Sequence, residues 1–387
     1  MGYFCAEGSL FVKLSMKLPM KLSMTVPTFR MNRTIAALAM SWVLLLLLGF
    51  QGTANALPQG NAVTDPKAIL RYSLPIDNPE IRKLQGAIED IAQQIRANRR
   101  WGAIGADLSR ADRVVTDKRE AILASIPDSF KPNAEGLLEG IKGDLELLHA
   151  DADGKKKEEI LEHRAILLDR VTQIEELMVS DFPFEVPAEY SKMPQLKGRA
   201  TVEFNTPLGP VTAVIDGFSA PVTGGNFIDL VDRGFYDGLP FTRAEDFYVL
   251  QTGDPEGPAE GFIDPKTNEY RAVPLEILVK GDKVPTYGIT LEDAGRYLDQ
   301  PVLPFNAYGA LGMARPNDEA NGGSSQFFFF LFEPELTPAG LNLLDGRYSI
   351  FGYVTGGQKI LRELKATDTI SSVKVIKGRE NLQVPQA

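Results

Sequence analysis

The sequence is poor in the two residue types on which nucleophilic and metal chemistry most often depends. Of its 387 residues, one is cysteine and two are histidine. A single cysteine excludes an intramolecular disulfide framework and a cysteine-rich zinc site, and two histidines leave little for a histidine-built metal centre. Acidic residues outnumber basic ones by 51 to 41, which argues against a nucleic-acid partner. We therefore expect no metal, no cofactor and no nucleic acid.

A long uncharged apolar run occurs near the beginning of the chain, at residues 34–50. It follows two arginines and precedes the tripeptide Ala-Asn-Ala at residues 54–56, which is the pattern of a secretory signal. We expect residues 1–56 to be removed, with Met1 or Met31 as the start; an uncleaved membrane anchor is the alternative, although the run is short for a span of ~20 residues. The remaining chain has no cysteine and a net charge of −14.

Residues 57–181 have the periodicity of amphipathic helices. Apolar residues recur at steps of three and four in four stretches, at residues 81–95, 108–123, 137–148 and 160–178, and the last is the clearest. Residues 77–79, Asp-Asn-Pro, supply a cap and a first-turn proline for the first stretch. Short links between the four stretches predict a four-helix antiparallel bundle. A long coiled coil is the alternative, but proline and glycine interrupt the pattern. Both histidines, at positions 149 and 163, are expected on solvated faces.

The periodicity changes after residues 182–196, which carry three prolines and are expected to form a stiff, extended linker. In residues 197–387, short β-type runs dominate, and only residues 222–233 and 358–365 have helical patterns. Many strands with few helices predict a β-barrel or a sandwich. This half contains neither histidine nor cysteine, which excludes a Ser-His-Asp or Cys-His nucleophile there.

Three blocks of aromatic and polar residues stand out in the β-rich half. The first runs from Phe241 to Asp254, the second comprises residues 312–315 and 321–330, and the third is residues 344–352. The first block begins with FTR and ends with QTGD. The second contains MA and, further on, SSQFFF, and the third reads LDGRYSIFG. In this order and spacing they resemble the cyclophilin family of peptidyl-prolyl isomerases, over about residues 200–377.

The resemblance implies a closed eight-stranded antiparallel β-barrel with two capping helices and an isomerase activity on X–Pro bonds. Arg243 matches the family's catalytic arginine, whose guanidinium can stabilise the twisted amide, and Gln251 would hold the substrate backbone. The proline pocket would comprise Phe241, Tyr248, Val249, Met313, Ala314, Gln326, Phe328, Leu343, Leu344 and Tyr348. Apart from the resemblance, Arg243 could instead form a surface ion pair with Glu245 or Asp246, and Phe328 could be part of the core.

Several positions depart from the family pattern, namely Tyr248, Val249, Arg315, Leu343 and Tyr348. The segment between the first two blocks is also about two dozen residues longer than in single-domain relatives, and residues 254–299 carry ten acidic side chains against five basic ones. Long loops in a compact domain are commonly functional. We expect weak isomerase activity and poor cyclosporin binding.

The whole organisation resembles the multidomain cyclophilins of the thylakoid lumen in cyanobacteria and chloroplasts. These combine an export signal, a helical bundle similar to the PsbQ subunit of photosystem II, a proline-rich link and a divergent cyclophilin domain. The resemblance implies a lumenal protein that assists photosystem II assembly or maintenance, proline-containing clients such as lumenal segments of photosystem II subunits, and a contact between bundle and barrel. A proline-segment-binding chaperone or scaffold with little turnover is the alternative.

Overall fold

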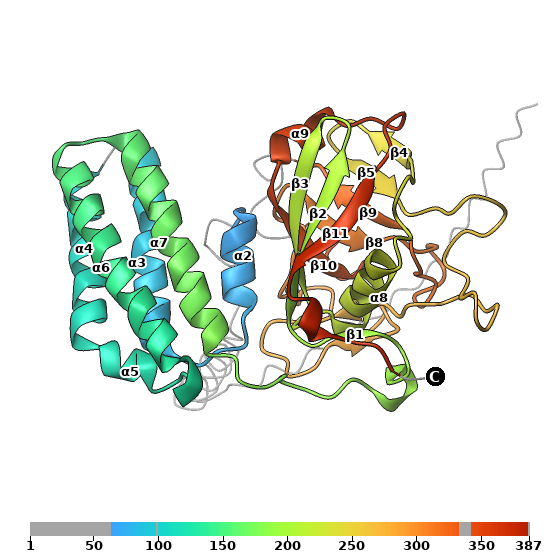
Figure 1. Cartoon of the computed structure of the whole chain (residues 1–387), viewed down its shortest axis with the longest axis horizontal. Helices are drawn as coiled ribbons and strands as arrows, with labels where there is room; N and C mark the ends of the chain where they lie inside the picture. Colours follow the sequence, from blue (N-terminus) through green and yellow to red (C-terminus); the bar gives the residue numbers. More distant parts are fainter. Residues whose placement is uncertain (1–62, 98–99, 333–341, 386–387) are drawn as a thin grey trace, which may run out of the picture. The chain divides into compact units, whose positions relative to one another are not determined.

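The computed structural model describes residues 63–97, 100–332 and 342–385, so the expected signal at residues 1–56 lies outside the described residues. Six helices precede residue 180 (Figure 1): α2 (Pro66–Ser73), α3 (Pro79–Arg96), α4 (Trp101–Asp117), α5 (Arg119–Leu123), α6 (Lys131–Asp153) and α7 (Lys157–Leu177). Two more follow, α8 (Pro221–Asp232) and α9 (Gln358–Glu363). No helix in these described ranges combines the length and apolarity needed to cross a membrane.

Helix α3 begins where the sequence predicts, at a capping residue followed by proline. The Asn78 side chain accepts hydrogen bonds from the backbone N–H groups of Glu80 and Ile81, at 3.1 and 3.0 Å. Pro79 occupies the first turn, where its missing N–H costs nothing. The apolar stripe that begins at Ile81 is fully buried, so this predicted helix is confirmed.

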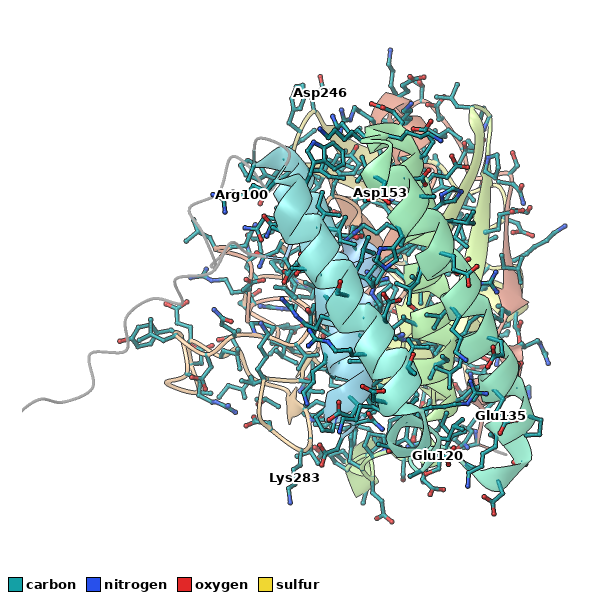
Figure 2. The ribbon with its side chains drawn as sticks, turned by 90° about the vertical axis from the view of Figure 1, so that its left-hand side faces the viewer. Arg100, Glu120, Glu135, Asp153, Asp246 and Lys283 are labelled. Carbon is teal, nitrogen blue, oxygen red and sulfur yellow. The ribbon has the colours of Figure 1, made fainter. Side chains whose placement is uncertain are left out.

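Helices α3, α4, α6 and α7 pack around one apolar core. Figure 2 shows the antiparallel course of two of them: Arg100 and Asp153 lie at one end of α4 and α6, and Glu120 and Glu135 lie near the other. Alternating directions with short links are typical of helix bundles.

The prediction of a four-helix bundle alone is wrong, because the described helical region contains six α-helices. Helix α2 is additional and starts at an Asp65 cap and Pro66. The apolar residues at 108–123, which the pattern places in one stretch, are divided between α4 and α5. The backbone leaves the helical region at Lys118 (φ −115°, ψ 10°), which turns the chain between them. Apolar periodicity continues across this break and therefore does not reveal it.

Both histidines join neighbouring helices and are not simply solvated. His149 Nε2 on α6 lies 2.7 Å from Asp112 Oδ2 on α4. His163 Nδ1 on α7 lies 2.6 Å from Asp151 Oδ2 on α6, and its side chain is only 28% exposed. Their expected place on solvated faces is therefore only partly correct, because both side chains are partly buried and contact a neighbouring helix.

An eight-stranded antiparallel sheet has the order β11-β2-β3-β10-β8-β9-β5-β4. Its strands are β2 (Arg199–Thr206), β3 (Gly209–Asp216), β4 (Phe241–Glu245), β5 (Val249–Thr252), β8 (Ala310–Met313), β9 (Phe327–Phe330), β10 (Ile350–Gly356) and β11 (Ser372–Lys377). Two small ladders accompany it: β1 (Gln195–Leu196) with β12 (Leu382–Gln383), and β6 (Glu276–Ile277) with β7 (Thr286–Tyr287). The end of the expected linker is thus already a strand.

The sheet is curled but open, so the prediction of a closed barrel is wrong. Its edge strands β4 and β11 form no ladder with each other. The chain segments beside them meet at one isolated bridge, between Pro240 and Thr369, with hydrogen bonds such as Ile370 N to Leu239 O at 2.9 Å. Proline has no N–H to donate, so Pro240 cannot extend this bridge into a ladder. Figure 1 shows α8 against this curved sheet, where it contacts β10 and β11.

Strand β9 separates two apolar clusters, because its four phenylalanines alternate between the faces of the sheet. Phe327 and Phe329 belong to the core that contains Phe204 and Phe227 of β2 and α8. Phe328 and Phe330 belong to a second cluster on the other face. A strand buried on both faces reads as a continuous apolar run, which explains the sequence FFFF.

A buried ionic cluster joins α2 to the sheet. The Arg199 Nη2 group of β2 donates to Asp216 Oδ2 at 3.0 Å and to the Leu70 carbonyl. Ser73 Oγ donates to the same Asp216 oxygen at 2.6 Å. The apolar side of α2 continues this contact, because Ile69 and Leu70 belong to the cluster that contains Phe328. Polar and apolar contacts therefore both hold α2 on the sheet.

The long acidic segment is anchored through a buried carboxylate. Glu276 of β6 accepts hydrogen bonds from the N–H groups of Val222 and Thr223, at distances down to 2.9 Å, at the start of α8. Negative charge is favourable at a helix N-terminus. Burial nevertheless outweighs these bonds and raises the pKa of Glu276 to about 7.

This raised pKa predicts a pH dependence of stability. The folded state holds the proton of Glu276 more tightly than the unfolded chain, so its contribution is complete below about pH 4.5 and is lost as the pH rises through 7. Chemical denaturation at pH 5 and pH 7.5 should show a free-energy difference about 1–3 kcal/mol larger for the wild type than for Glu276→Gln. Equal pH dependence in both proteins would contradict this assignment.

Candidate active site

A row of residues crosses the sheet from its edge. The register pairs Arg243 of β4 with Gln251 of β5, Gln251 with Phe328 of β9, and Phe328 with Gly312 of β8. Residues directly opposite each other in antiparallel strands project to the same face. The ladder therefore brings an arginine, a glutamine and a phenylalanine, which are 85 positions apart in sequence from first to last, side by side.

A pocket of about 440 Å³ lies over this row. Nine of the twelve site residues expected from the sequence line it: Arg243, Tyr248, Val249, Gln251, Ala314, Gln326, Phe328, Leu344 and Tyr348. Its lining combines the guanidinium and amide groups with an apolar floor.

The other three expected residues are not among those that line the pocket. Phe241 and Met313 are 2% and 3% exposed and belong to the core on the opposite face. Met313 follows Gly312 in β8, and successive residues of a strand point to opposite faces. Leu343 is 90% exposed.

The pocket also includes residues outside the expected set. They come from the long acidic segment and from the loop before β9: Glu260, Tyr270, Arg315, Pro316, Asn317, Gly322 and Ser324. The sequence marks Arg315 and the length of the segment as departures from the family, but no periodicity indicates which of its residues reach the pocket.

The catalytic candidate Arg243 is bound to a neighbour on its own strand. Its Nε and Nη2 groups lie 2.7 and 2.6 Å from Glu245 Oε1, and its Cζ lies 5.9 Å from the centre of the Tyr248 ring. Arg243 and Glu245 are each about half exposed. The sequence left open whether Arg243 forms an ion pair with Glu245 or with Asp246, and in the structure its partner is Glu245.

A chain of amide hydrogen bonds fixes the polar side of the pocket. Gln251 Nε2 donates to Gln326 Oε1 at 2.8 Å. Gln326 Nε2 in turn donates to Asp254 Oδ1 at 3.0 Å and to the Glu260 carbonyl at 2.9 Å. Because these acceptors cannot donate, the network determines which way both amides point. Asp254, the last residue of the first motif, therefore supports Gln251 through Gln326.

Aromatic rings hold Phe328 at the pocket floor. Phe305 stacks on it at 5.9 Å with 6° between the rings, and Tyr348 meets it edge-on at 5.5 Å. The Arg315 guanidinium lies 5.3 Å from the centre of the Tyr348 ring and donates to the Arg347 carbonyl at 2.8 Å. Phe328 is only 6% exposed, so its position depends on these neighbours.

Asp345, the second residue of the LDG motif, supports the same floor from behind. Its carboxylate accepts hydrogen bonds from the backbone N–H groups of Phe305 at 2.7 Å and Asn342 at 3.2 Å. Burial raises the pKa of Asp345 to about 6, although these bonds act in the opposite direction. The side chain therefore fixes the backbone that presents Phe305 to Phe328.

Gly312 is required by its closeness to Phe328. A Cβ atom at this position would lie 2.5 Å from Phe328 Cζ. We expect Gly312→Ala to displace the ring, to lower the free energy of unfolding by about 1–3 kcal/mol and to weaken binding of proline peptides. Denaturant unfolding and peptide titration measure the two effects. Gly143→Ala on α6, where the new Cβ meets nothing within 4 Å, is the control. It should leave peptide binding unchanged and raise the free energy of unfolding by about 0.5–1 kcal/mol, because alanine is favoured over glycine inside a helix. A Gly312→Ala protein that behaves like this control would contradict the account.

Comparisons with known proteins agree with these two regions. Residues 65–179 match the family model described as peptidyl-prolyl cis-trans isomerase CYP38-like, PsbQ-like domain. Residues 201–380 match the model of cyclophilin-type peptidyl-prolyl cis-trans isomerases.

Full-length relatives share both regions. The chain is 58% identical over 328 residues to a Synechocystis protein named putative thylakoid lumen peptidyl-prolyl cis-trans isomerase, which covers 85% of this chain and 86% of that protein. It is 43% identical over 341 residues to the chloroplastic isomerase CYP38 of Arabidopsis thaliana, covering 86% of this chain and 78% of that protein.

The expectation of a cyclophilin resemblance is thus confirmed, together with the PsbQ-like nature of the helical region. The identities and coverage extend across the helices, the sheet and the pocket. The chain belongs to the cyclophilin-type peptidyl-prolyl cis-trans isomerases that carry a CYP38-like, PsbQ-like helical domain, and it is an enzyme of that class.

Proposed function

We propose that this isomerase works in the thylakoid lumen, turns over slowly, and acts on proline-containing segments of photosystem II subunits during assembly or maintenance. The observation that carries the catalytic part is the row of Arg243, Gln251 and Phe328 along the pocket. A cation, an amide and an apolar floor are the groups that X–Pro isomerisation requires.

The proposed mechanism follows from the barrier of the reaction. Amide resonance gives peptide rotation a barrier of about 18–20 kcal/mol. A proline ring on Phe328 would leave its nitrogen within reach of Arg243, whose guanidinium can donate to that nitrogen as it becomes pyramidal. Gln251 would hold the neighbouring backbone. These interactions strengthen as the amide twists, so they lower the barrier rather than only binding the substrate.

The lumenal location is supported by the names of the relatives and by the expected signal. The Synechocystis relative is named a thylakoid lumen protein and the Arabidopsis one is chloroplastic. We expect the protein to be recovered from the lumenal fraction of washed thylakoids with Leu57 as its N-terminal residue. Recovery in the cytoplasm, or with the segment 1–56 intact in the membrane, would contradict this location.

A role in photosystem II is supported by the PsbQ-like domain match. In a strain without the gene, native gels should show photosystem II assembly intermediates, and the wild-type gene should restore the mature complex. The Arg243→Ala gene separates two roles. If isomerisation is required, this variant fails to restore the complex; full restoration would favour the second candidate, a proline-segment-binding scaffold, which is supported by the engagement of Arg243 with Glu245.

A further inference from the structure

The arginine at the pocket shares its face of β4 with a carboxylate. Glu245 is two residues from Arg243, and the register places it opposite Val249, just as Arg243 is opposite Gln251. Alternate residues of a strand project to the same side, so the Glu245 carboxylate and the Arg243 guanidinium both face the side on which Val249 and Gln251 line the pocket. Glu245 is therefore the ion-pair partner of a residue that lines the site, Arg243.

Arg243 donates a hydrogen bond from Nε to Oε1 of Glu245, and its Nη2 group forms an ion pair with the same oxygen. Gln251, which lies opposite Arg243, directs its amide to Gln326 instead. The Tyr248 ring, 5.9 Å from the Arg243 Cζ, adds a cation–π contact. The place and the electrostatic environment of the guanidinium are thus set mainly by Glu245.

A carboxylate at this distance opposes the task of the arginine. Stabilisation of the twisted amide depends on the positive charge and the free donors of the guanidinium. Glu245 occupies the Nε–Nη2 edge and reduces the positive potential that a substrate nitrogen would experience. Both side chains are about half exposed, so solvent screens the pair and the effect is moderate.

We infer that Glu245 is a positioning residue that restrains Arg243 and lowers the turnover of this isomerase. The inference rests on the proposed catalytic role of Arg243 and names a cause for slow turnover that lies within the chain. A client or partner that binds the Glu245 carboxylate through a basic group would release Arg243 and accelerate the reaction.

The test separates the effect of the Glu245 charge on kcat from the effect of its hydrogen bond to Arg243. Glu245→Gln removes the charge but keeps an amide oxygen that can orient Arg243, whereas Glu245→Ala removes both. With an uncharged proline peptide, we expect kcat of the Glu245→Gln protein to rise about three- to five-fold while KM stays within about two-fold. If Glu245 only orients the arginine, Glu245→Gln would match the wild type and Glu245→Ala would be slower, which would overturn the inference.

Two controls make the result specific. Asp246→Asn removes the same charge from the next residue, which is exposed at the top of Figure 2, and should leave kcat unchanged. In the Arg243→Ala background, Glu245→Gln should give no gain. An equal gain in Asp246→Asn, or a gain that persists without Arg243, would overturn the inference, as would a Glu245→Gln protein that remains at the uncatalysed rate.

The same series separates this inference from the proposed function. If Arg243→Ala is as active as the wild type, the catalytic assignment of Arg243 itself fails. If Arg243→Ala is slower but Glu245→Gln is not faster than the wild type, only the role of Glu245 fails. Thermal unfolding midpoints within about 2 °C of each other would show that the rates compare equally folded proteins.

Discussion

Arg243→Ala should lower kcat/KM for a proline peptide by about 100-fold while leaving the protein folded. Removing one preorganised donor from a transition-state site commonly costs 10²–10³ in rate, and about 2.7 kcal/mol corresponds to 100-fold. The lower end applies here because the guanidinium is half exposed and already paired with Glu245. A protease-coupled assay with the full chain from residue 57 measures the change.

Arg243→Lys provides the matched variant. Lysine keeps the charge but lacks the planar fork that can donate to two substrate atoms at once, so we expect an intermediate loss of about ten-fold. An Arg243→Ala protein with wild-type kcat/KM would contradict the mechanism. A large fall in the unfolding midpoint would show a structural role for a side chain that the structure places at the surface.

Asp216→Ala should destabilise the fold by about 3–5 kcal/mol, because it removes the fully buried partner of Arg199 and leaves that arginine only its longer ion pair, to Glu176 at 3.8 Å. The Asp216 side chain is fully buried. Its Oδ2 atom accepts from Arg199 at 3.0 Å and from Ser73 at 2.6 Å, while Oδ1 accepts from the Phe218 N–H at 2.9 Å. The substitution therefore leaves a hydroxyl group of α2 and a backbone N–H of the turn before α8 without the acceptor that Asp216 provides. Denaturant unfolding at neutral pH measures the loss.

The exposed ion pair between Asp232 and Arg379 is a suitable control for this experiment. Its N–O distance is 2.9 Å, close to that of the buried pair, but the Arg379 side chain is 72% exposed. Surface pairs contribute at most about 1 kcal/mol, so Asp232→Ala should have a small effect. Similar losses for the two substitutions would contradict the account of a buried cluster that holds α2 on the sheet.

The sequence predicted those parts of the fold that local pattern determines. The start of α3 followed from Asn78 and Pro79, because a cap and an N1 proline act within one turn. The resemblance of the three motifs to the cyclophilin family identified Arg243, Gln251 and Phe328 as members of one site, and the strand register brings these three together.

The remaining parts depend on interactions that periodicity does not encode. The open edge of the sheet follows from how the segments around Pro240 and Thr369 approach each other in space. The break at Lys118 lies inside a continuous apolar pattern. Glu245 rather than Asp246 pairs with Arg243 because alternate residues of β4 project to the same side, and this became clear only once the bounds of β4 were known. The place of Met313 in the core follows from a strand, β8, that the pattern did not reveal.

The most direct test of the central claim is exchange NMR of a cis/trans proline peptide with the full chain. The account predicts exchange cross-peaks in the presence of wild-type protein, with shift changes at Gln251 and Phe328, and accelerated cross-peaks with Glu245→Gln. It predicts that Arg243→Ala retains the shift changes but loses most of the exchange. Catalysed exchange that is equally fast with Arg243→Ala would contradict it, as would wild-type exchange without any shift change in the pocket.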